Sequence, residues 1–174
     1  MSHWTPRDTM EADMNETTKS EVLVRNLRPS DLEAVIALDA KNVGRRREEY
    51  FRVKLQQNLV ETGIKVSLAA EIDGALIGFL LARVYYGEFG QTEPVAMLDT
   101  IDVHPSFRGR SVATALFEQL RINLFGLGVT SLRTEVAWNE LSLIGFFQHE
   151  GFHPAPRLCL ELEITAARRE RDEE

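Results

Sequence analysis

The sequence predicts an α/β protein in which one mixed sheet carries helices on both faces. Three observations support this class. The chain has 174 residues, which suffice for one domain with a substantial core but not for two domains and a linker. Apolar residues recur with a period of two in some segments and near four in others, as in strands and helices respectively. The two kinds of segment alternate along the chain, which predicts layers of sheet and helix.

The first predicted elements are a strand and two helices. Val22–Arg25 has the apolar composition of a strand. Ser30 follows shortly and precedes apolar residues on one helical face, so we interpret it as an N-cap. A second helix is expected over Arg46–Glu61, where apolar residues are spaced four apart. These two helices are expected to form one wall of a substrate cleft.

A hairpin and a further strand occupy the middle of the chain. Ser67–Ile72 and Ala75–Tyr85 are apolar stretches joined by Asp73-Gly74, the strongest short-range hairpin signal. Pro94–Val103 is expected to form the next strand.

The C-terminal half is expected to alternate helix and strand. The period changes from two to nearly four at Arg108-Gly109, which predicts a helix over Val112–Phe125. Glycines end this helix and the later one at Leu141–His149, with a strand at Ser131–Val136 between them. Leu158–Ile164 alternates apolar and polar residues, which predicts a half-buried strand.

Composition limits the function classes. Twenty basic and 27 acidic residues give a formal charge of −7, which argues against nucleic acid as a partner, because a phosphate backbone requires a basic face. The acidic balance is mildly compatible with amine substrates. The apolar runs are too short to cross a bilayer and the N-terminus does not resemble a signal peptide, so we expect a cytoplasmic protein with no membrane partner. The single cysteine, Cys159, agrees with a reducing compartment.

Polar and charged ends flank the predicted domain. Residues 1–20 lack apolar periodicity and are expected to form a flexible arm. Residues 166–174 form a mixed charge run, which is typical of a solvated tail. The domain itself is expected to span residues 21–165.

The turn Arg108-Gly109-Arg110-Ser111 is suited to bind an anion. The first N–H groups of a helix have no internal partner, and the helix dipole adds partial positive charge there. Together they can hold a phosphate group. Gly109 permits close approach of the backbone, and the two arginines can add charge-assisted bonds. The pattern is neither the nucleotide P-loop nor the dinucleotide fingerprint.

Two motifs resemble a known family. The run from Asp102 to Ala113, Asp-Val-His-Pro-Ser-Phe-Arg-Gly-Arg-Ser-Val-Ala, is similar to the coenzyme-binding pattern of the GNAT superfamily of N-acetyltransferases. Asn139, followed by a helix that ends Phe146-Phe147-Gln148-His149-Glu150-Gly151-Phe152, is similar to the second signature of that family. The resemblance covers about residues 22–164, with both motifs in the family's order.

The resemblance implies a mixed, mostly antiparallel sheet with a V-shaped opening between two central strands, Met97–Val103 and Ser131–Val136. Acetyl-CoA is the implied cosubstrate, with its pantetheine arm in the opening. The implied contacts are the backbone of Ile101, Asp102 and Val103 for pantetheine, the amides of Arg108, Gly109, Arg110, Ser111, Val112, Ala113 and Thr114 for the pyrophosphate, and Asn139 and Phe147 near the pantetheine end.

Two positions depart from the family pattern. Ser111 stands where the family usually has glycine, although a serine in the first helical turn can still donate its N–H. Phe147 stands where many members have a tyrosine proposed to protonate the departing thiolate. Without that phenol, the thiolate takes its proton from water or another group, or leaves as an anion stabilised by the helix terminus.

Simpler structural roles compete with these assignments. Arg108 and Arg110 can be solvated charges, although cations at the start of a helix are unfavourable unless an anion joins them. Phe146 and Phe147 fit a packing role better than a coenzyme clamp. We expect no metal site, because no cysteine or carboxylate pair completes a ligand set with the histidines. Cys159 is expected to serve in packing.

Carboxylates near the predicted opening are the candidates for a general base. Asp99 and Asp102 lie in an otherwise apolar strand, and Glu135 lies on the strand expected to flank the opening. Asp99 or Glu135 could take a proton from an ammonium acceptor, directly or through water. The alternative is that they face solvent or cap a loop.

These observations predict direct acetyl transfer from acetyl-CoA to a primary amine in a ternary complex. The acceptor is left open between a small-molecule amine and a peptide or protein amine. The alternative from another class is a CoA-binding regulatory module without catalysis, which the phenylalanine at position 147 allows. A homodimer is also left open.

Overall fold

The computed structural model describes residues 21–86, 90 and 92–164. The predicted N-terminal arm and C-terminal tail lie outside these residues. The chain divides into two compact units at Glu135/Val136, which we call the sheet unit and the C-terminal unit. The sheet unit contains β1 (Leu23–Asn26), α1 (Leu32–Val43), α2 (Glu48–Leu55), β2 (Leu68–Ile72), β3 (Ala75–Tyr85), β4 (Val95–Val103), α3 (Val112–Gly126) and β5 (Ser131–Thr134), and the C-terminal unit contains α4 (Leu141–His149).

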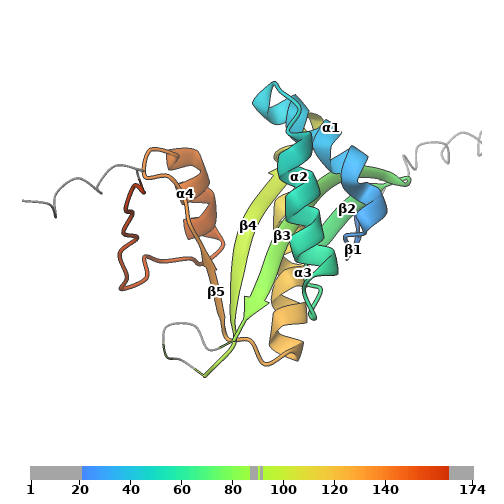
Figure 1. The fold of residues 1–174 in the computed structure, drawn as a ribbon. Coiled ribbons are helices and arrows are strands. Elements are labelled where there is room, and N and C mark those ends of the chain that lie inside the picture. Colours follow the sequence, from blue (N-terminus) through green and yellow to red (C-terminus); the bar gives the residue numbers. More distant parts are fainter. Residues whose placement is uncertain (1–20, 87–89, 91, 165–174) are drawn as a thin grey trace, which may run out of the picture. The chain divides into compact units, whose positions relative to one another are not determined.

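The five strands form one sheet in the order β1-β2-β3-β4-β5 (Figure 1). The first four strands pair antiparallel, and β5 runs parallel to β4. At the β2–β3 turn, Asp73 and Gly74 have φ angles of 50° and 77°. Two positive φ angles are what a tight hairpin requires. The predicted mixed, mostly antiparallel sheet is therefore confirmed.

Helices cover both faces of the sheet unit. Figure 1 shows α1 and α2 in front of the sheet and α3 behind it. Phe79 and Leu81 of β3 belong to the core under α1 and α2, which contains Leu27, Val35, Ile36, Leu38, Phe51, Leu55, Leu59 and Ala69 as well. On the other face, a Cβ atom added at Gly78 would lie 3.0 Å from Val112 Cγ1 and 3.3 Å from the Asp102 carbonyl oxygen. The absence of a side chain at Gly78 therefore lets the start of α3 pack directly on β3.

A β-bulge interrupts β4. Leu81 pairs with Thr100 while its neighbour Ala82 pairs with Leu98, so Asp99 is an extra residue in the ladder. A bulge bends its strand and increases the local twist. Asp99 therefore lies at the bend of the strand that faces β5.

The edge of β4 that faces β5 becomes unpaired at this bend. The pairing of β4 with β5 ends at Leu98 and Thr134, although β4 continues to Val103. β5 itself ends at Thr134, so β4 has no pairing with β5 from Asp99 onward (Figure 1). This unpaired edge of β4 lies where the family resemblance implies one side of the opening.

Three predicted features of the sheet unit are corrected by the structure. The second helix spans only Glu48–Leu55 and continues as a wider π-helical turn over Gln56–Val60. Ser30 lies inside a short 3₁₀ turn rather than at an N-cap. The residue at the N-cap position of α1 is Asp31, and its carboxylate accepts the Arg28 N–H at 2.8 Å. β5 ends two residues earlier than predicted, at Thr134.

In the C-terminal unit, α4 buries one aromatic residue. Phe147 is 5% exposed. The centre of its ring lies 5.5 Å from that of Phe146 and 5.0 Å from that of Phe152. These are ordinary distances for aromatic packing. Phe147 therefore serves in packing in this unit, in agreement with the structural alternative drawn from the sequence.

The predicted strand at Leu158–Ile164 is wrong. This segment has no strand pairing, and its apolar residues Leu158, Leu160, Leu162 and Ile164 are 80% to 88% exposed. Cys159 is exposed as well, so it does not serve in packing. Alternation of apolar and polar residues gives a strand two different faces, but the strand also requires a neighbour for its backbone hydrogen bonds. Sequence periodicity carries no information on that neighbour.

No helix among the described residues is long and apolar enough to cross a membrane.

Candidate active site

The turn between β4 and α3 is held to the sheet and contains two left-handed residues. His104 donates its N–H to the Ile77 carbonyl at 2.8 Å, and Pro105–Phe107 forms a 3₁₀ turn. Gly109 and Ser111 then have φ angles of 72° and 59°. These positive angles turn the chain so that α3 begins at Val112. The start of α3 thus lies beside the end of β4.

Ser111 is the N-cap of α3 and not a residue of its first turn. Its carbonyl oxygen accepts the first helical hydrogen bond, from Ala115 N–H at 2.9 Å. Its left-handed backbone conformation costs about 1–2 kcal/mol in a residue with a Cβ and nothing in glycine. The expectation of a helical serine at this position is therefore corrected, and the structure explains why glycine suits it.

The start of α3 provides donors for an anion. Because the first helical bond is made by Ala115, the amides of Val112 and Ala113 precede it and point out of the helix end. Arg108 and Arg110 are exposed beside them. The Arg110 guanidinium lies 5.3 Å from the centre of the Phe107 ring. Helix-end amides next to two exposed cations are suited to bind a phosphate group.

Asn42, near the C-terminal end of α1, joins three parts of this site. Its side-chain amide donates to the Asp102 carboxylate and to the Val103 carbonyl oxygen, the latter at 3.0 Å. Its Oδ1 accepts a hydrogen bond from Arg108 Nη2 at 2.6 Å. One amide therefore links α1 to the end of β4 and to the anion-binding turn. Sequence reasoning missed Asn42, because an asparagine near a helix end has no distinctive local signal.

Asp102 is a half-buried carboxylate at the end of β4. Burial raises its pKa to about 6, and the neighbouring charge of Asp39 acts in the same direction. Hydrogen bonds from Val103 N–H, at 3.0 Å, and from Asn42 oppose this rise. Both backbone groups of Val103 therefore have partners within the protein. A pantetheine arm that bonds to Val103 has to exchange with these contacts.

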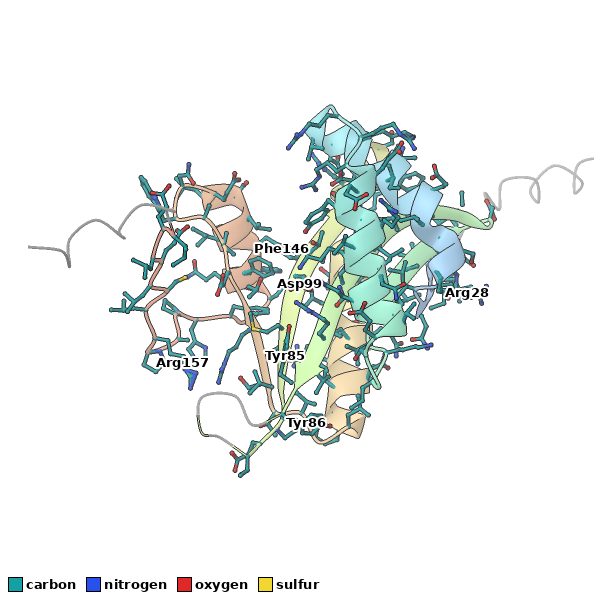
Figure 2. All side chains as sticks on the ribbon, in the orientation of Figure 1. Arg28, Tyr85, Tyr86, Asp99, Phe146 and Arg157 are labelled. Carbon is teal, nitrogen blue, oxygen red and sulfur yellow. The ribbon has the colours of Figure 1, made fainter. Side chains whose placement is uncertain are left out.

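Asp99, the bulge residue labelled in Figure 2, contacts two cations. Arg83 of β3 donates to its carboxylate from Nε at 3.1 Å and from Nη2 at 3.4 Å. Lys54 Nζ of α2 lies 3.6 Å from the same carboxylate. The side chain of Asp99 is only 14% exposed. Its negative charge is therefore already engaged by positive charges.

The bulge directs two consecutive residues of β4 toward α2. Thr100 Oγ1 lies 3.4 Å from the hydroxyl of Tyr50 on α2, and Asp99 contacts α2 through Lys54. In a regular strand, neighbouring side chains point to opposite faces, and a bulge locally removes this alternation. A single face of the sheet unit thus gathers two cations, two hydroxyls and a carboxylate.

Asn58 lies in the π-helical turn next to this group. It is fully buried, and its Nδ2 donates to the Lys54 carbonyl at 2.8 Å and approaches Asp99 at 3.5 Å. Both contacts are with acceptors, so the side-chain amide cannot be reversed. Its Oδ1 has no hydrogen-bond partner among the described residues. A π-turn that places such a group is frequently found at functional sites.

The remaining predicted site residues are Glu135, Asn139 and Phe147. Glu135 directly follows β5 and is exposed. Asn139 is exposed in a turn of the C-terminal unit, and Phe147 is buried in that unit. Within the described part of the chain, no group of three or more histidine, cysteine, aspartate and glutamate residues could hold a metal ion.

The sheet unit is thus an α/β fold with an anion-binding turn between β4 and α3. The model of the acetyltransferase (GNAT) family matches residues 32–152, and the chain belongs to this family.

Solved structures of acetyltransferases share the fold. AAC(6')-Iy in complex with the bisubstrate analog CoA-S-monomethyl-acetylneamine is similar with a TM-score of 0.69 and 22% identity, over 84% of this chain and 100% of that one. The aminoglycoside 6'-N-acetyltransferase AAC(6')-Ih from Acinetobacter baumannii has a TM-score of 0.69 and 23% identity, over 83% and 99%. The ribosomal-protein-alanine N-acetyltransferase from Brucella melitensis biovar Abortus 2308 has a TM-score of 0.67 and 19% identity, over 83% and 100%.

Proposed function

We propose that this protein transfers an acetyl group from acetyl-CoA to a primary amine by direct attack in a ternary complex. The observation that carries the proposal is the left-handed turn at Gly109 and Ser111, which presents the α3 amides and two exposed arginines beside the unpaired edge of β4. Membership of the GNAT family supports the reaction class. AAC(6')-Iy, which shares the fold, has been solved with CoA and with a CoA-derived bisubstrate analog.

The proposed coenzyme contacts follow the anion-binding turn and β4. The amides from Arg108 to Thr114 are proposed to hold the pyrophosphate, and the backbone from Ile101 to Val103 to hold pantetheine. Asn139 is kept as a coenzyme contact on the family resemblance alone. The burial of Phe147 between Phe146 and Phe152 supports a packing role for it.

The chemistry requires positioning more than covalent catalysis. The nitrogen of the neutral amine attacks the thioester carbonyl carbon, the C–S bond breaks, and the coenzyme leaves as a thiolate. The nitrogen, positively charged after the attack, loses one proton to water to give the neutral amide. Holding the two reactants in place can account for about 7–11 kcal/mol of barrier. A backbone N–H of Ile101 or Asp102 on the unpaired edge is proposed to stabilise the oxyanion. Water is proposed to protonate the thiolate, because Phe147 carries no acidic group.

The proton of the acceptor ammonium leaves through Glu135 or through water in this proposal. Asp99, the other candidate base, is held by Arg83 and Lys54. An acceptor ammonium would have to displace these two cations to reach the carboxylate. Glu135 is exposed and forms no ion pair within the described residues, so it is the better candidate of the two.

Coenzyme binding tests the proposal directly. Acetyl-CoA is expected to raise the melting temperature, because a ligand at a hundredfold excess over Kd stabilises the native state by about 2.7 kcal/mol. Arg108→Ala should weaken binding measured by calorimetry, while Arg52→Ala, which changes an exposed arginine of α2, should not. The absence of both a thermal shift and a calorimetric signal at millimolar acetyl-CoA would refute coenzyme binding.

Turnover separates the enzyme from a regulatory module. The alternative function is a CoA-binding module without catalysis, which the lack of a phenol at Phe147 favours. Release of free thiol from acetyl-CoA in the presence of an amine panel is expected for the enzyme. Tight coenzyme binding without turnover of any amine would favour the module.

A further inference from the structure

We propose that the acceptor amine carries a carboxylate, and that Arg83 and Lys54 bind this group. This inference rests on the proposed acetyl transfer and names the class of its acceptor. We call Lys54, Arg83 and Asp99 the basic cluster. The acceptor would be an amino acid or a similarly small amine with an anionic group.

The basic cluster has an excess of positive charge. It contains two cations and one carboxylate, and Asp99 cannot neutralise both partners. The side chains of Arg83 and Lys54 are each 24% exposed. They are therefore half-buried, where a charge is less screened than on the open surface. Such a site attracts a carboxylate and repels an acceptor that carries only positive charge.

Both cations retain hydrogen-bonding capacity. Arg83 uses Nε and Nη2 for Asp99, and its Nη1 makes no hydrogen bond to any described residue. Lys54 Nζ is 3.6 Å from Asp99, which is too long for a hydrogen bond. The Arg83 guanidinium also lies 5.3 Å from the centre of the Tyr85 ring. A guanidinium fixed on one side by a carboxylate and an aromatic ring is pre-organised to bind a second carboxylate.

The cluster lies where an acceptor is needed. Asp99 is the first residue of β4 beyond the last pair with β5. The proposed oxyanion donors at Ile101 and Asp102 are two and three residues further along the strand, or roughly 7–10 Å at the usual rise per residue. The long side chains of Arg83 and Lys54 cover part of this distance. A small molecule that carries both an amine and a carboxylate can cover the rest, with its carboxylate on the cluster and its amine near the oxyanion donors. The hydroxyls of Tyr50 and Thr100 lie on the same face and can bind its polar groups.

This assignment differs from the acceptor that one structural neighbour binds. AAC(6')-Iy was solved with an analog built on neamine, which is a polyamine. Neamine offers cationic groups and no carboxylate to a positively charged cluster. We therefore expect this protein to prefer anionic acceptors over aminoglycosides.

Matched acceptor pairs test the inference. Each pair consists of an amino acid and its decarboxylated amine, such as phenylalanine with phenethylamine and lysine with cadaverine. The wild-type protein should show at least a tenfold higher kcat/KM for the carboxylate-bearing member. Lys54→Gln and Arg83→Gln should each lower kcat/KM for the amino acid about tenfold. They should change kcat/KM for the decarboxylated amine less than twofold. Lys65→Gln, which changes an exposed lysine outside the cluster, should change neither.

A pair of peptides tests whether the carboxylate belongs to a free amino acid or to a side chain of a peptide. Two tetrapeptides with free N-termini and Glu or Gln in the second position are compared in the same assay. Preference for the Glu peptide over every free amino acid would overturn the small-acceptor assignment.

Other outcomes overturn the inference while leaving the proposed function intact. The decarboxylated amines could be turned over as well as or better than their paired amino acids, with no change in Lys54→Gln and Arg83→Gln. That result would show that the basic cluster does not bind the acceptor. If acetyl-CoA binds but no panel member is turned over, calorimetry measures the binding of the amino acids to the CoA complex. The absence of heat that depends on the carboxylate would then overturn the inference. Loss of acetyl-CoA binding itself would instead contradict the proposed function.

Folding of the variants is checked by circular dichroism and thermal melting. If Arg83→Gln fails to fold, Lys54→Gln decides the question, because Lys54 Nζ makes no hydrogen bond within the described residues and its loss leaves the Arg83 and Asp99 contact in place.

Discussion

At the scale of single residues, Asp102 is expected to make stability depend on pH. Burial raises its pKa from 3.8 to about 6, so the native state binds a proton more tightly than the unfolded state. This contribution to stability is fully present below about pH 4 and is lost as the pH rises through 6. An asparagine stays neutral like the protonated carboxyl, so Asp102→Asn removes the pH dependence. The variant should match the stability of the wild type near pH 4 and exceed it by about 1 kcal/mol at pH 7.5, after allowance for partial exposure.

Urea denaturation from pH 4 to 8 measures this difference. Glu61→Gln, which changes an exposed carboxylate, is the control and should show no such trend. A constant difference between Asp102→Asn and wild type across this range would show that burial does not perturb the carboxyl group.

The protein is expected to be less stable with serine at position 111 than with glycine there. Its φ angle of 59° lies in the left-handed region, where a residue with a Cβ is strained and glycine is not. Ser111→Gly should therefore stabilise the protein by about 1 kcal/mol, or slightly less after the entropy of the unfolded chain is counted. Thermal melting measures the change, and acetyl-CoA affinity should remain within twofold. Destabilisation would show that the serine side chain makes a contact that outweighs the strain.

Some site residues were predictable from the sequence and others were not. Gly109 and the two arginines beside it stand in a local pattern whose chemistry follows from helix-end geometry. Asn42 and Arg83 could not be assigned, because each acts through a contact with β4 or its turn that is distant in sequence. Arg108 lies 66 positions from the asparagine to which it donates. Local periodicity contains no record of such contacts.

At the scale of elements, Gly78 is expected to control the packing of α3 on β3. An added Cβ would meet Val112 Cγ1 at 3.0 Å and the Asp102 backbone oxygen at 3.3 Å, and the backbone atom cannot rotate away. Gly78→Ala should therefore destabilise the protein by about 1–3 kcal/mol, as overpacking does. It should also weaken acetyl-CoA binding, because Val112 follows the anion-binding turn. Denaturation and calorimetry measure the two effects.

Gly126→Ala is the matched control for this substitution. Gly126 ends α3, and a Cβ there meets no atom within 4 Å. The control should be neutral or slightly stabilising, since alanine is the better helix former. If Gly78→Ala behaved like this control, the close packing of α3 on β3 would not matter for stability.

The hairpin and the bulge differ in how far the sequence could predict them. Asp73-Gly74 specifies its turn through two positive φ angles, and the structure has both. The bulge at Asp99 has no comparable local signal, because it arises from the pairing of β4 with two strands of different length and direction. The sequence alone therefore predicted β1 to β5, together with a strand at Leu158–Ile164 that does not form, and only the family resemblance implied an opening beside β4.

At the scale of the whole molecule, the overall charge and the charge of the site have opposite signs. The chain carries a formal charge of −7, which from composition favours amine substrates, whereas the basic cluster holds two cations around one carboxylate. Screening limits long-range charge effects to about 8–10 Å at moderate salt. A bound acceptor is therefore governed by the groups beside it, and net charge is a poor guide to its chemistry.

Protection from hydrogen exchange is expected to differ strongly between segments of the chain. Exchange requires opening of backbone hydrogen bonds, so paired and buried segments exchange slowly. The strands β2, β3 and β4 lie inside the sheet and, with α3, should be the slowest segments. Leu158–Ile164 has no strand pairing and exposes its apolar side chains, so it should exchange almost completely within seconds.

Mass-spectrometric exchange at two protein concentrations tests this distribution. Strong protection of residues 158–164 at both concentrations would contradict the structure and restore the strand that alternation predicts. Protection that appears only at the higher concentration would show that the segment pairs with a second copy. In either case the missing neighbour, and not the pattern of side chains, decides whether these residues form a strand, because backbone hydrogen bonds must be satisfied before an apolar face can be buried.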